Sequence, residues 1–285
     1  MTKSKKIAIG ELAFDYRVAG EGNKEFVILL HGFPETSIMW TLLMNHLASL
    51  GFCCIAPDMR GYSSGACPKG VQNYTVDKLS DDIVNIAKEL KTDRFHLIGH
   101  DWGAAVGWHL VYHHPERINS WTALSVPHNK AFAKAYKTDP EQKKRSRYIG
   151  FFLLPIIPEI MIRRNDFQMF RRLWKNSGPE EMNHYLSVFR RKPSLTGALN
   201  YYRANLRRGK GQRIGYIETP TLFIWGKKDL AIGEAAAKGT EEYMKGEYAF
   251  LELDGGHWLI QTNYAEVESA IGGHLLRHKF APGQS

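Results

Sequence analysis

The sequence predicts an α/β fold, a mostly parallel central sheet flanked by helices with an inserted helical lid. Short apolar runs alternate with helix-patterned stretches, the pattern that builds a parallel sheet with crossover helices. This alternation stops near residue 127 and resumes near residue 214, and the segment between them is basic, aromatic and helix-patterned. We therefore expect a core of residues 1–127 and 214–285 and a helical cap of residues 128–213.

Continuous apolar runs predict the buried strands, and apolar spacing at helical period predicts the helices. The expected strands are 26–30, 53–56, 95–99, 121–125, 221–225 and 248–253. The expected core helices are 38–50, 76–90, 104–112 and 264–277. Each expected strand is separated from the next by enough chain for a crossover, which favours parallel pairing.

Length and composition allow a large core without a metal or a disulfide. The chain has 285 residues, of which 44% are hydrophobic, enough for one domain with an insertion. It has three cysteines; Cys53 and Cys54 are neighbours in an apolar run, and none has metal-ligand spacing. We interpret all three as buried thiols in a reducing compartment, and we expect neither a metal nor an organic cofactor.

The sequence offers no good export signal or membrane span. The basic start of the chain turns polar within a few residues, whereas a signal peptide continues into an apolar run. The longest apolar stretch, 149–162, is interrupted by Pro155, Pro158 and Glu159 and is too short to cross a bilayer. We expect a cytoplasmic protein.

The net charge of the chain is +9, and its positive excess lies in the cap. Residues 128–213 contain 20 Lys and Arg against 6 Asp and Glu. A basic segment can bind nucleic acid, but these charges are scattered in pairs without a recognisable nucleic-acid module. We expect a solvated basic face and no nucleic-acid partner.

The central motif is Gly-His-Asp-Trp-Gly at 99–103, which follows an expected strand and precedes an expected helix. This context matches the G-x-S-x-G nucleophile elbow, with Asp101 in place of the serine. Flanking glycines permit the tight corner, and the helix N-terminus favours an ionised carboxylate. Asp101 is therefore a candidate nucleophile. Alone, the motif would fit a helix N-cap equally well.

Two further residues complete a candidate triad with Asp101. Asp229 and His257 each follow an expected strand, at the strand ends where open α/β sheets place their sites. Their order along the chain, nucleophile then acid then base, is the order that this elbow demands. Either residue alone could be an ordinary turn or surface residue, but the three placements together favour a triad.

A loop after the first expected strand provides a candidate oxyanion hole. It reads His-Gly-Phe-Pro at 31–34 and would supply the amide of Phe33, with the second amide from Trp102. A simple turn is the alternative interpretation. We expect Pro34 and Trp258, which lie beside the candidate catalytic loops, to line the substrate pocket.

Together these motifs resemble the epoxide hydrolases of the α/β-hydrolase superfamily over nearly the whole chain. The segments 31–35 (His-Gly-Phe-Pro-Glu), 58–63 (Asp-Met-Arg-Gly-Tyr-Ser) and 99–103 carry the resemblance with the Asp229 and His257 loops. Haloalkane and fluoroacetate dehalogenases share the aspartate nucleophile. The former usually carry Asn where Phe33 stands and the latter Arg where Trp102 stands, so both positions favour the epoxide hydrolases.

The resemblance implies two cap tyrosines that hydrogen-bond the epoxide oxygen. Asn-Tyr-Tyr-Arg at 200–203 resembles the segment that carries the second tyrosine, which maps onto Tyr202. Tyr-Ile-Gly-Phe-Phe at 148–152 resembles the first-tyrosine segment, but Phe151 occupies the position of the expected hydroxyl and is expected to line the pocket. Tyr148 can substitute from one turn earlier, because residues three apart share a helix face. Simple core packing is the alternative for either tyrosine.

The implied reaction opens an epoxide to a vicinal diol through an ester on Asp101, which water activated by His257 hydrolyses. Two alternatives stay open. The same triad could serve a haloalkane or haloacid dehalogenase, or the fold could be a non-catalytic ligand-binding receptor, although an intact triad argues against a pure binder. The aromatic cap indicates an apolar or aryl small-molecule substrate, whereas its basic excess leaves room for a carboxylate. Monomer and homodimer are both compatible with the sequence.

Overall fold

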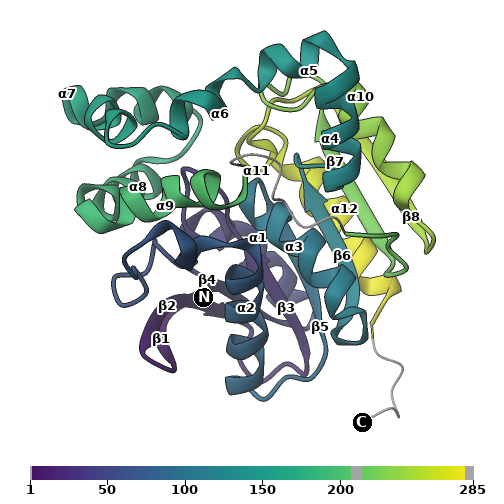
Figure 1. Ribbon diagram of the computed structural model, residues 1–285. Coiled ribbons are helices and arrows are strands. Elements are labelled where there is room, and N and C mark those ends of the chain that lie inside the picture. The colour runs from purple at the N-terminus through teal and green to yellow at the C-terminus, as the bar shows by residue number, and fades with distance from the viewer. Residues whose placement is uncertain (1, 207–213, 280–285) are drawn as a thin grey trace.

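The computed structural model describes residues 2–206 and 214–279. In this part of the chain, helices cover both faces of a twisted sheet, and further helices lie above one end of it (Figure 1). Helices α2 (Val76–Glu89) and α3 (Trp102–His113) pack together on one face. Helices α1 (Thr41–Ser49) and α12 (Tyr264–Arg277) contact each other on the other. The layers are those of an α/β-hydrolase fold.

The described residues form a sheet of eight strands in the order β1-β2-β4-β3-β5-β6-β7-β8. The strands are β1 (Lys3–Ile9), β2 (Leu12–Ala19), β3 (Glu25–Leu30), β4 (Phe52–Pro57), β5 (Phe95–His100), β6 (Ile118–Leu124), β7 (Thr221–Gly226) and β8 (Tyr248–Leu253). Strands β3 to β8 pair in parallel, whereas β2 pairs antiparallel with both β1 and β4. The parallel strands direct their carboxyl ends to one edge, beneath the inserted helices.

The central strands form the core of the molecule. Every residue of β4, β5, β6 and β7 is buried, as expected for parallel strands covered on both faces. All six strands predicted from apolar runs are present. Strands β1 and β2 were not predicted: β1 is largely exposed and mostly polar, but the alternating buried residues of β2 are a period-2 signal that could have revealed it.

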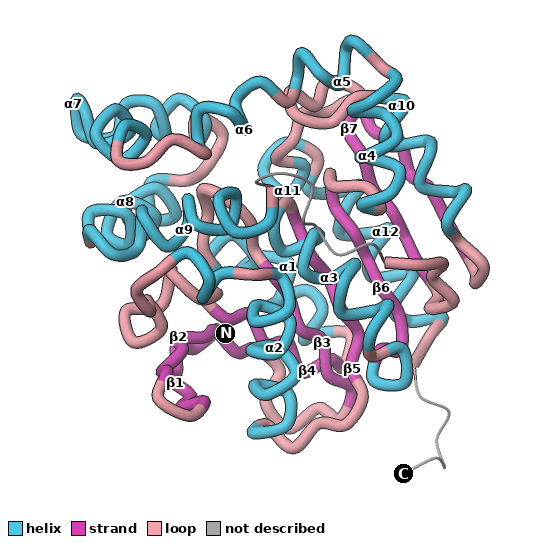
Figure 2. The backbone as a smooth tube through the Cα atoms, viewed as in Figure 1, coloured by secondary structure: helices cyan, strands magenta, loops and turns pink. Residues whose placement is uncertain are grey.

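The inserted region is helical, as predicted, and lies over the carboxyl ends of the strands (Figure 2). Its helices are α4 (Asn129–Thr138), α5 (Pro140–Arg145), α6 (Arg147–Phe152), α7 (Ile157–Leu173), α8 (Pro179–Arg190) and α9 (Lys192–Asn205). The predicted end of the cap at residue 213 lies outside the described residues. The core helices α10 (Glu234–Lys238) and α11 (Leu259–Thr262) follow it. No helix in the described part is long and apolar enough to span a bilayer.

The three cysteines differ in their surroundings. Cys53 and Cys54 in β4 are buried free thiols, as predicted. The prediction was wrong for Cys67, which is only half-buried. It lies in a loop, where its thiol donates to the backbone oxygen of Gly61 at 3.2 Å. Its thiol therefore has a polar partner, whereas those of Cys53 and Cys54 lie in a buried strand.

Candidate active site

Asp101 stands at a sharp corner between β5 and α3. Its backbone has φ 50° and ψ −118°, a conformation that costs a non-glycine residue free energy. Glycines let the chain pass close to this corner. A Cβ on Gly32 would lie 2.3 Å from the Cβ of Asp101, and one on Gly103 would lie 2.1 Å from the Leu30 backbone oxygen. The tight packing fixes the direction in which the Asp101 carboxylate points.

The Asp101 carboxylate is held between a backbone amide and an imidazole. The Phe33 amide donates to Oδ1 at 2.7 Å, and Oδ2 lies 3.4 Å from Nε2 of His257. Burial alone would raise the pKa of Asp101, but its hydrogen bond to His257, electrostatic attraction by His257 and His100, and the Phe33 amide lower it below its ordinary value. The buried side chain is therefore an anion at neutral pH.

His257 is bound on its other side by Asp229. Its Nδ1 donates to Oδ2 of Asp229 at 2.7 Å, and both side chains are buried. Burial alone would lower the pKa of His257, but the carboxylates of Asp229 and Asp101 outweigh it and raise that pKa to about 10. The structure thus brings together all three residues of the predicted triad.

The acid loop that carries Asp229 is organised by its own amides and by helix α5. Oδ1 of Asp229 accepts from the amides of Ala231 at 2.7 Å and Ile232 at 3.0 Å. From α5, the fully buried Gln142 donates to the backbone oxygen of Ala231 at 2.9 Å and accepts from the amide of Gly233 at 2.8 Å. The cap therefore helps to hold the triad acid. Sequence reasoning missed this role, because nothing local marks Gln142.

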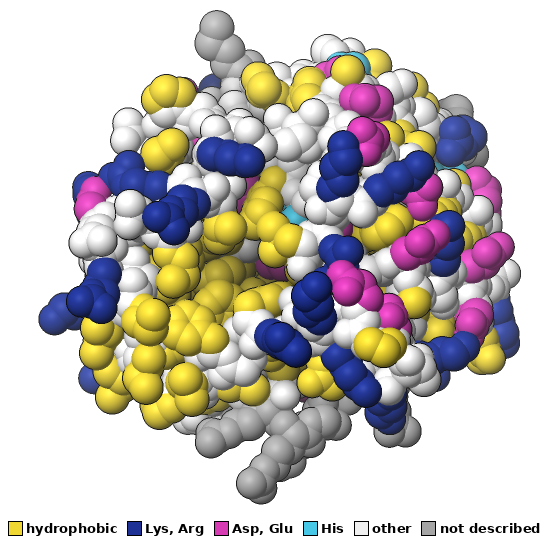
Figure 3. All heavy atoms as spheres, turned by 90° about the horizontal axis from the view of Figure 1, so that it is seen from above, with side chains coloured by type: hydrophobic (Ala, Val, Ile, Leu, Met, Phe, Trp, Pro, Cys, Tyr) yellow, Lys and Arg dark blue, Asp and Glu magenta, His cyan; other side chains and the backbone are white. Residues whose placement is uncertain are grey.

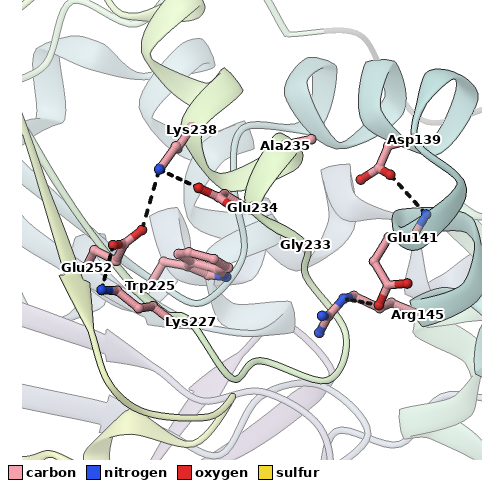
Figure 4. Close-up of a pocket in the computed structure, with 10 residues that line it drawn as sticks. All are labelled: Asp139, Glu141, Arg145, Trp225, Lys227, Gly233, Glu234, Ala235, Lys238 and Glu252. Carbon is pink, nitrogen blue, oxygen red and sulfur yellow. Dashed lines mark hydrogen bonds and ion pairs between the residues drawn. The ribbon is translucent and has the colours of Figure 1, made fainter.

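Arg145, one turn further along α5, donates to the backbone oxygen of Asp229. Figure 4 shows it turned toward Glu141, with which it forms an ion pair at 3.2 Å. These residues border an open cleft of about 720 Å³, whose other walls include Trp225 and Lys238. No triad residue lines this cleft, so it is distinct from the triad site.

The backbone oxygen of His257 also has two buried donors. Nε2 of His100 donates to it at 2.9 Å and Oγ of Ser125 at 2.7 Å. The other ring nitrogen of His100 lies 3.3 Å from Oε2 of Glu35. These contacts fix the loop that presents the imidazole. His100 and Glu35 both lie inside the motifs that the sequence singled out, but their supporting role was not predicted.

Tyr202 and Tyr148 lie close together above this constellation. Tyr202, on α9, is buried edge-on against Phe33 and Trp102, with ring centroids 5.5 and 5.1 Å apart. The ring of Tyr148, on α6, lies 6.3 Å from that of Tyr202. Burial and the nearby Asp101 charge raise the pKa of both hydroxyls, so both are protonated at rest and can donate.

Phe152 was not predicted in the site, but its ring lies against the same groups. It is buried, with its centroid 4.9 Å from that of Tyr202 and 5.3 Å from that of Phe33. Phe151 is half-buried, and among the described ring contacts its ring meets only that of Phe152, at 5.6 Å. On the short helix α6, Tyr148 and Phe152 are one turn apart and share the inward face.

The other two predicted pocket residues flank the catalytic loops. Pro34 is buried, and its backbone oxygen accepts from the indole of Trp174 at 3.1 Å. Trp258 is half-buried, with its ring 5.2 Å from that of His257. In residues 2–206 and 214–279, no group of three His, Cys, Asp or Glu side chains is placed to hold a metal ion.

The family model for the alpha/beta hydrolase fold matches residues 25–264. Epoxide hydrolase 4 of Mus musculus is 32% identical over 276 residues, which cover 93% of this chain and 76% of that protein. Epoxide hydrolase A of Mycobacterium tuberculosis is 30% identical and covers 89% of this chain and 91% of its own length. The crystal structure of a Bacillus megaterium epoxide hydrolase in complex with an inhibitor has a TM-score of 0.87 at 26% identity. It covers 95% of this chain and 100% of its own.

The fold, the family match and these relatives agree over about nine tenths of the chain. The sheet order and the inserted helices give the fold, and the relatives identify the branch within it. The chain belongs to the α/β-hydrolase fold family and, within it, to the group that contains the epoxide hydrolases.

Proposed function

We propose that the protein hydrolyses epoxides to vicinal diols through a covalent ester on Asp101. The observation that carries the proposal is the position of the Asp101 carboxylate: it is anionic, buried and held between the Phe33 amide and His257. Two protonated tyrosines lie on the cap side of the same site. A nucleophile and acids of this kind suit a strained electrophile whose leaving group is an alkoxide.

In the first step, an oxygen of Asp101 attacks an epoxide carbon, a C–O bond of the ring breaks and an ester forms. The departing alkoxide takes a proton from a tyrosine hydroxyl, for which Tyr202 is our first choice and Tyr148 our second. A carboxylate nucleophile needs no base to activate it. His257 is therefore not required as a base in this step, and its positive charge keeps Asp101 ionised.

In the second step, neutral His257 takes a proton from water, and the resulting hydroxide attacks the ester carbonyl. The amides of Phe33 and Trp102 would hold the developing oxyanion. Ester formation removes the Asp101 charge, one of the two carboxylates that raise the pKa of His257. The imidazole consequently releases its proton more readily in the ester than at rest, and the tyrosinate left by ring opening accepts it. When the tetrahedral intermediate collapses, the departing diol oxygen takes the proton of the newly formed carboxylic acid. Asp101 is then an anion again, and His257 keeps the proton taken from water.

The chemistry of the pocket favours an apolar, aryl-bearing epoxide. Phe33 packs edge-on against Phe152, Phe170, Phe189 and Tyr202, which gives the cap side of the site an aromatic lining. A solved structure of a variant of the Bacillus megaterium enzyme, 26% identical to this chain, holds its naphthyloxy-propanediol product. Aromatic side chains prefer such edge-to-face contacts with aryl groups.

Dehalogenation is the second candidate. The indole N–H of Trp258 is buried without a hydrogen-bond partner among the described residues, and its ring contacts that of His257. Such a donor suits a departing halide, and the triad would act in the same way. The two functions differ in whether the leaving group needs a proton, so they differ in their need for Tyr202.

The covalent intermediate provides the test of this proposal. Replacement His257→Gln should leave ester formation intact and stop its hydrolysis, so intact-protein mass spectrometry should show one added substrate on a peptide containing Asp101. A panel of styrene-oxide-like epoxides, haloalkanes and haloacids identifies the substrate class. The control His113→Gln, at an exposed histidine of α3, should turn over without an adduct. Unmodified His257→Gln protein with every compound that the wild type converts would overturn the assignment.

A further inference from the structure

The cap exposes a row of large apolar side chains at the start of α7. Ile156, Ile157, Ile160 and Met161 are 67, 48, 58 and 43% exposed. Ile157, Ile160 and Met161 follow the spacing i, i+3, i+4, which places them on one face of α7. Ile156 directly precedes the helix, with φ 66°. Leu154, just before the helix, is 41% exposed. We call these five residues the apolar ridge. Single exposed apolar residues are ordinary, but a contiguous group marks an interaction surface.

The ridge is not a poorly packed stretch of core. The opposite side of the same helix is buried through Pro158 and Ile162, so α7 has a packed face and a free one. An open groove of about 490 Å³ runs beside the ridge, with Val71 and Leu153 in its walls. Figure 3 shows apolar side chains gathered around a hollow on the side of the upper face that carries α7. The helix therefore presents its free apolar face outward.

Exposed positive charges occur on α6, on α7 and just after α7. Exposed Arg147, Arg164, Arg172 and Lys175 have no ion-pair partner among the contacts of the described residues. By contrast, Arg171 and Arg190 are paired with Asp166, at 2.5 and 2.9 Å. In Figure 3, basic side chains stand at the margin of the apolar region, and most acidic ones lie on the other side of the view. The surface combines apolar side chains with a positive rim.

We propose that the apolar ridge and its basic rim dock the cap on an anionic lipid bilayer. Helices with an apolar face and a Lys/Arg-rich margin lie in the boundary between headgroups and acyl chains, and anionic lipids attract basic residues near the surface. A second copy of the chain fits less well. Two caps with 20 basic and 6 acidic residues each would bring like charges face to face.

This inference does not rest on the proposed reaction, because lipid binding can be measured without turnover. If both hold, the cap faces the layer in which apolar epoxides dissolve. The test is sedimentation of the full chain with vesicles of phosphatidylcholine mixed with phosphatidylglycerol, and with vesicles of phosphatidylcholine alone. The partition coefficient should be about tenfold or more higher on the anionic vesicles, since several basic residues approach the surface. It should fall as salt screens those charges.

Two double variants separate the apolar and electrostatic contributions. The first variant combines Ile156→Ser with Ile160→Ser, and the second combines Arg164→Gln with Arg172→Gln. Each should lower the partition coefficient on anionic vesicles about tenfold or more. The matched controls are Leu276→Ser, at a residue of α12 that is 46% exposed, and Lys88→Gln, at an exposed residue of α2. Both controls should bind as the wild type does. All six positions are exposed, and circular dichroism checks that each variant is folded.

Three outcomes would overturn the proposal. The first is equal sedimentation with both vesicle types, or none with either. The second is a loss of binding in the control variants as large as in the ridge and rim variants. The third is a wild-type dimer, measured by analytical ultracentrifugation, that the Ile156→Ser, Ile160→Ser variant converts to monomer, because the ridge would then be covered by a second copy of the chain.

Discussion

Nε2 of His257 lies 3.4 Å from Oδ2 of Asp101, at the outer limit of a hydrogen bond. The same imidazole is held at 2.7 Å by Asp229. The acid therefore fixes the ring, whereas the contact with the candidate nucleophile is loose. When Asp101 forms an ester and loses its charge, Asp229 still holds the imidazole in position. A two-step reaction needs this arrangement, because His257 acts after the ester has formed.

A single turnover in heavy-oxygen water tests whether Asp101 acts as the nucleophile and water attacks only the ester. Because water attacks the ester carbonyl in our proposal, its oxygen should enter the Asp101 carboxylate, and the product should receive an oxygen of the enzyme. With enzyme in excess, the first diol should lack label, and peptide mass spectrometry should find label on Asp101. Label that enters the diol directly would show water attacking the substrate itself, with Asp101 as a base.

The pH dependence of stability should report the proton on His257. Its pKa is raised from 6.5 to about 10 in the folded protein, so the folded state holds the proton more tightly than the unfolded one. This stabilisation is complete below pH 6.5 and is lost as pH rises toward 10. Denaturant unfolding should show the free energy of unfolding falling over that window. The slope should be smaller in His257→Gln, and equal slopes would mean that the residue has no raised pKa.

Gln142 should act on the second step through the acid loop. Gln142→Ala removes its bonds to Ala231 and Gly233, and we expect it to cost about 1–3 kcal/mol in the free energy of unfolding. Single-turnover kinetics should show slower ester hydrolysis with ester formation nearly unchanged. The reason is that Asp229 orients His257, which acts as a base only in ester hydrolysis. The control Ser146→Ala loses one bond to Gln142 and leaves the loop contacts intact. Equal slowing of both steps by Gln142→Ala would contradict a positioning role.

The parallel part of the fold was predictable because its strands are buried on both faces and read as continuous apolar runs. Strand β1 gave no such signal, since its polar residues face solvent at the sheet edge. Helix α1 begins at Thr41, not at residue 38, because a short 3-10 helix, Ser37–Trp40, precedes it. Apolar spacing cannot distinguish these two kinds of helix over one turn.

For the site, chain order and glycine-flanked motifs predicted which loops meet. They could not predict contacts that depend on cap packing. The orientation of α6 turns Phe152 toward Tyr202 and leaves Phe151 at its margin, and two adjacent phenylalanines look equivalent in sequence. The support that Gln142 gives to the acid loop likewise joins segments 89 residues apart. Only the folded arrangement of cap and core creates such pairs.

The choice between epoxide hydrolysis and dehalogenation depends on Tyr202, because an alkoxide needs its hydroxyl and a halide does not. Tyr202→Phe should slow ester formation from epoxides by about one to three powers of ten and change the rate on any halogenated substrate far less. If Tyr148 shares the developing charge, Tyr148→Phe should slow the same step, and the double variant should be slower than either single one. If Tyr148 contributes nothing, the loss in Tyr202→Phe should lie at the upper end.

The control is Tyr201→Phe, whose hydroxyl donates to the backbone oxygen of Arg60 at 2.7 Å and so lacks a role in ring opening. Circular dichroism and the thermal midpoint establish that each variant is folded. A folded Tyr202→Phe enzyme that opens epoxides at the wild-type rate would remove this residue as the ring-opening acid and make dehalogenation the first choice.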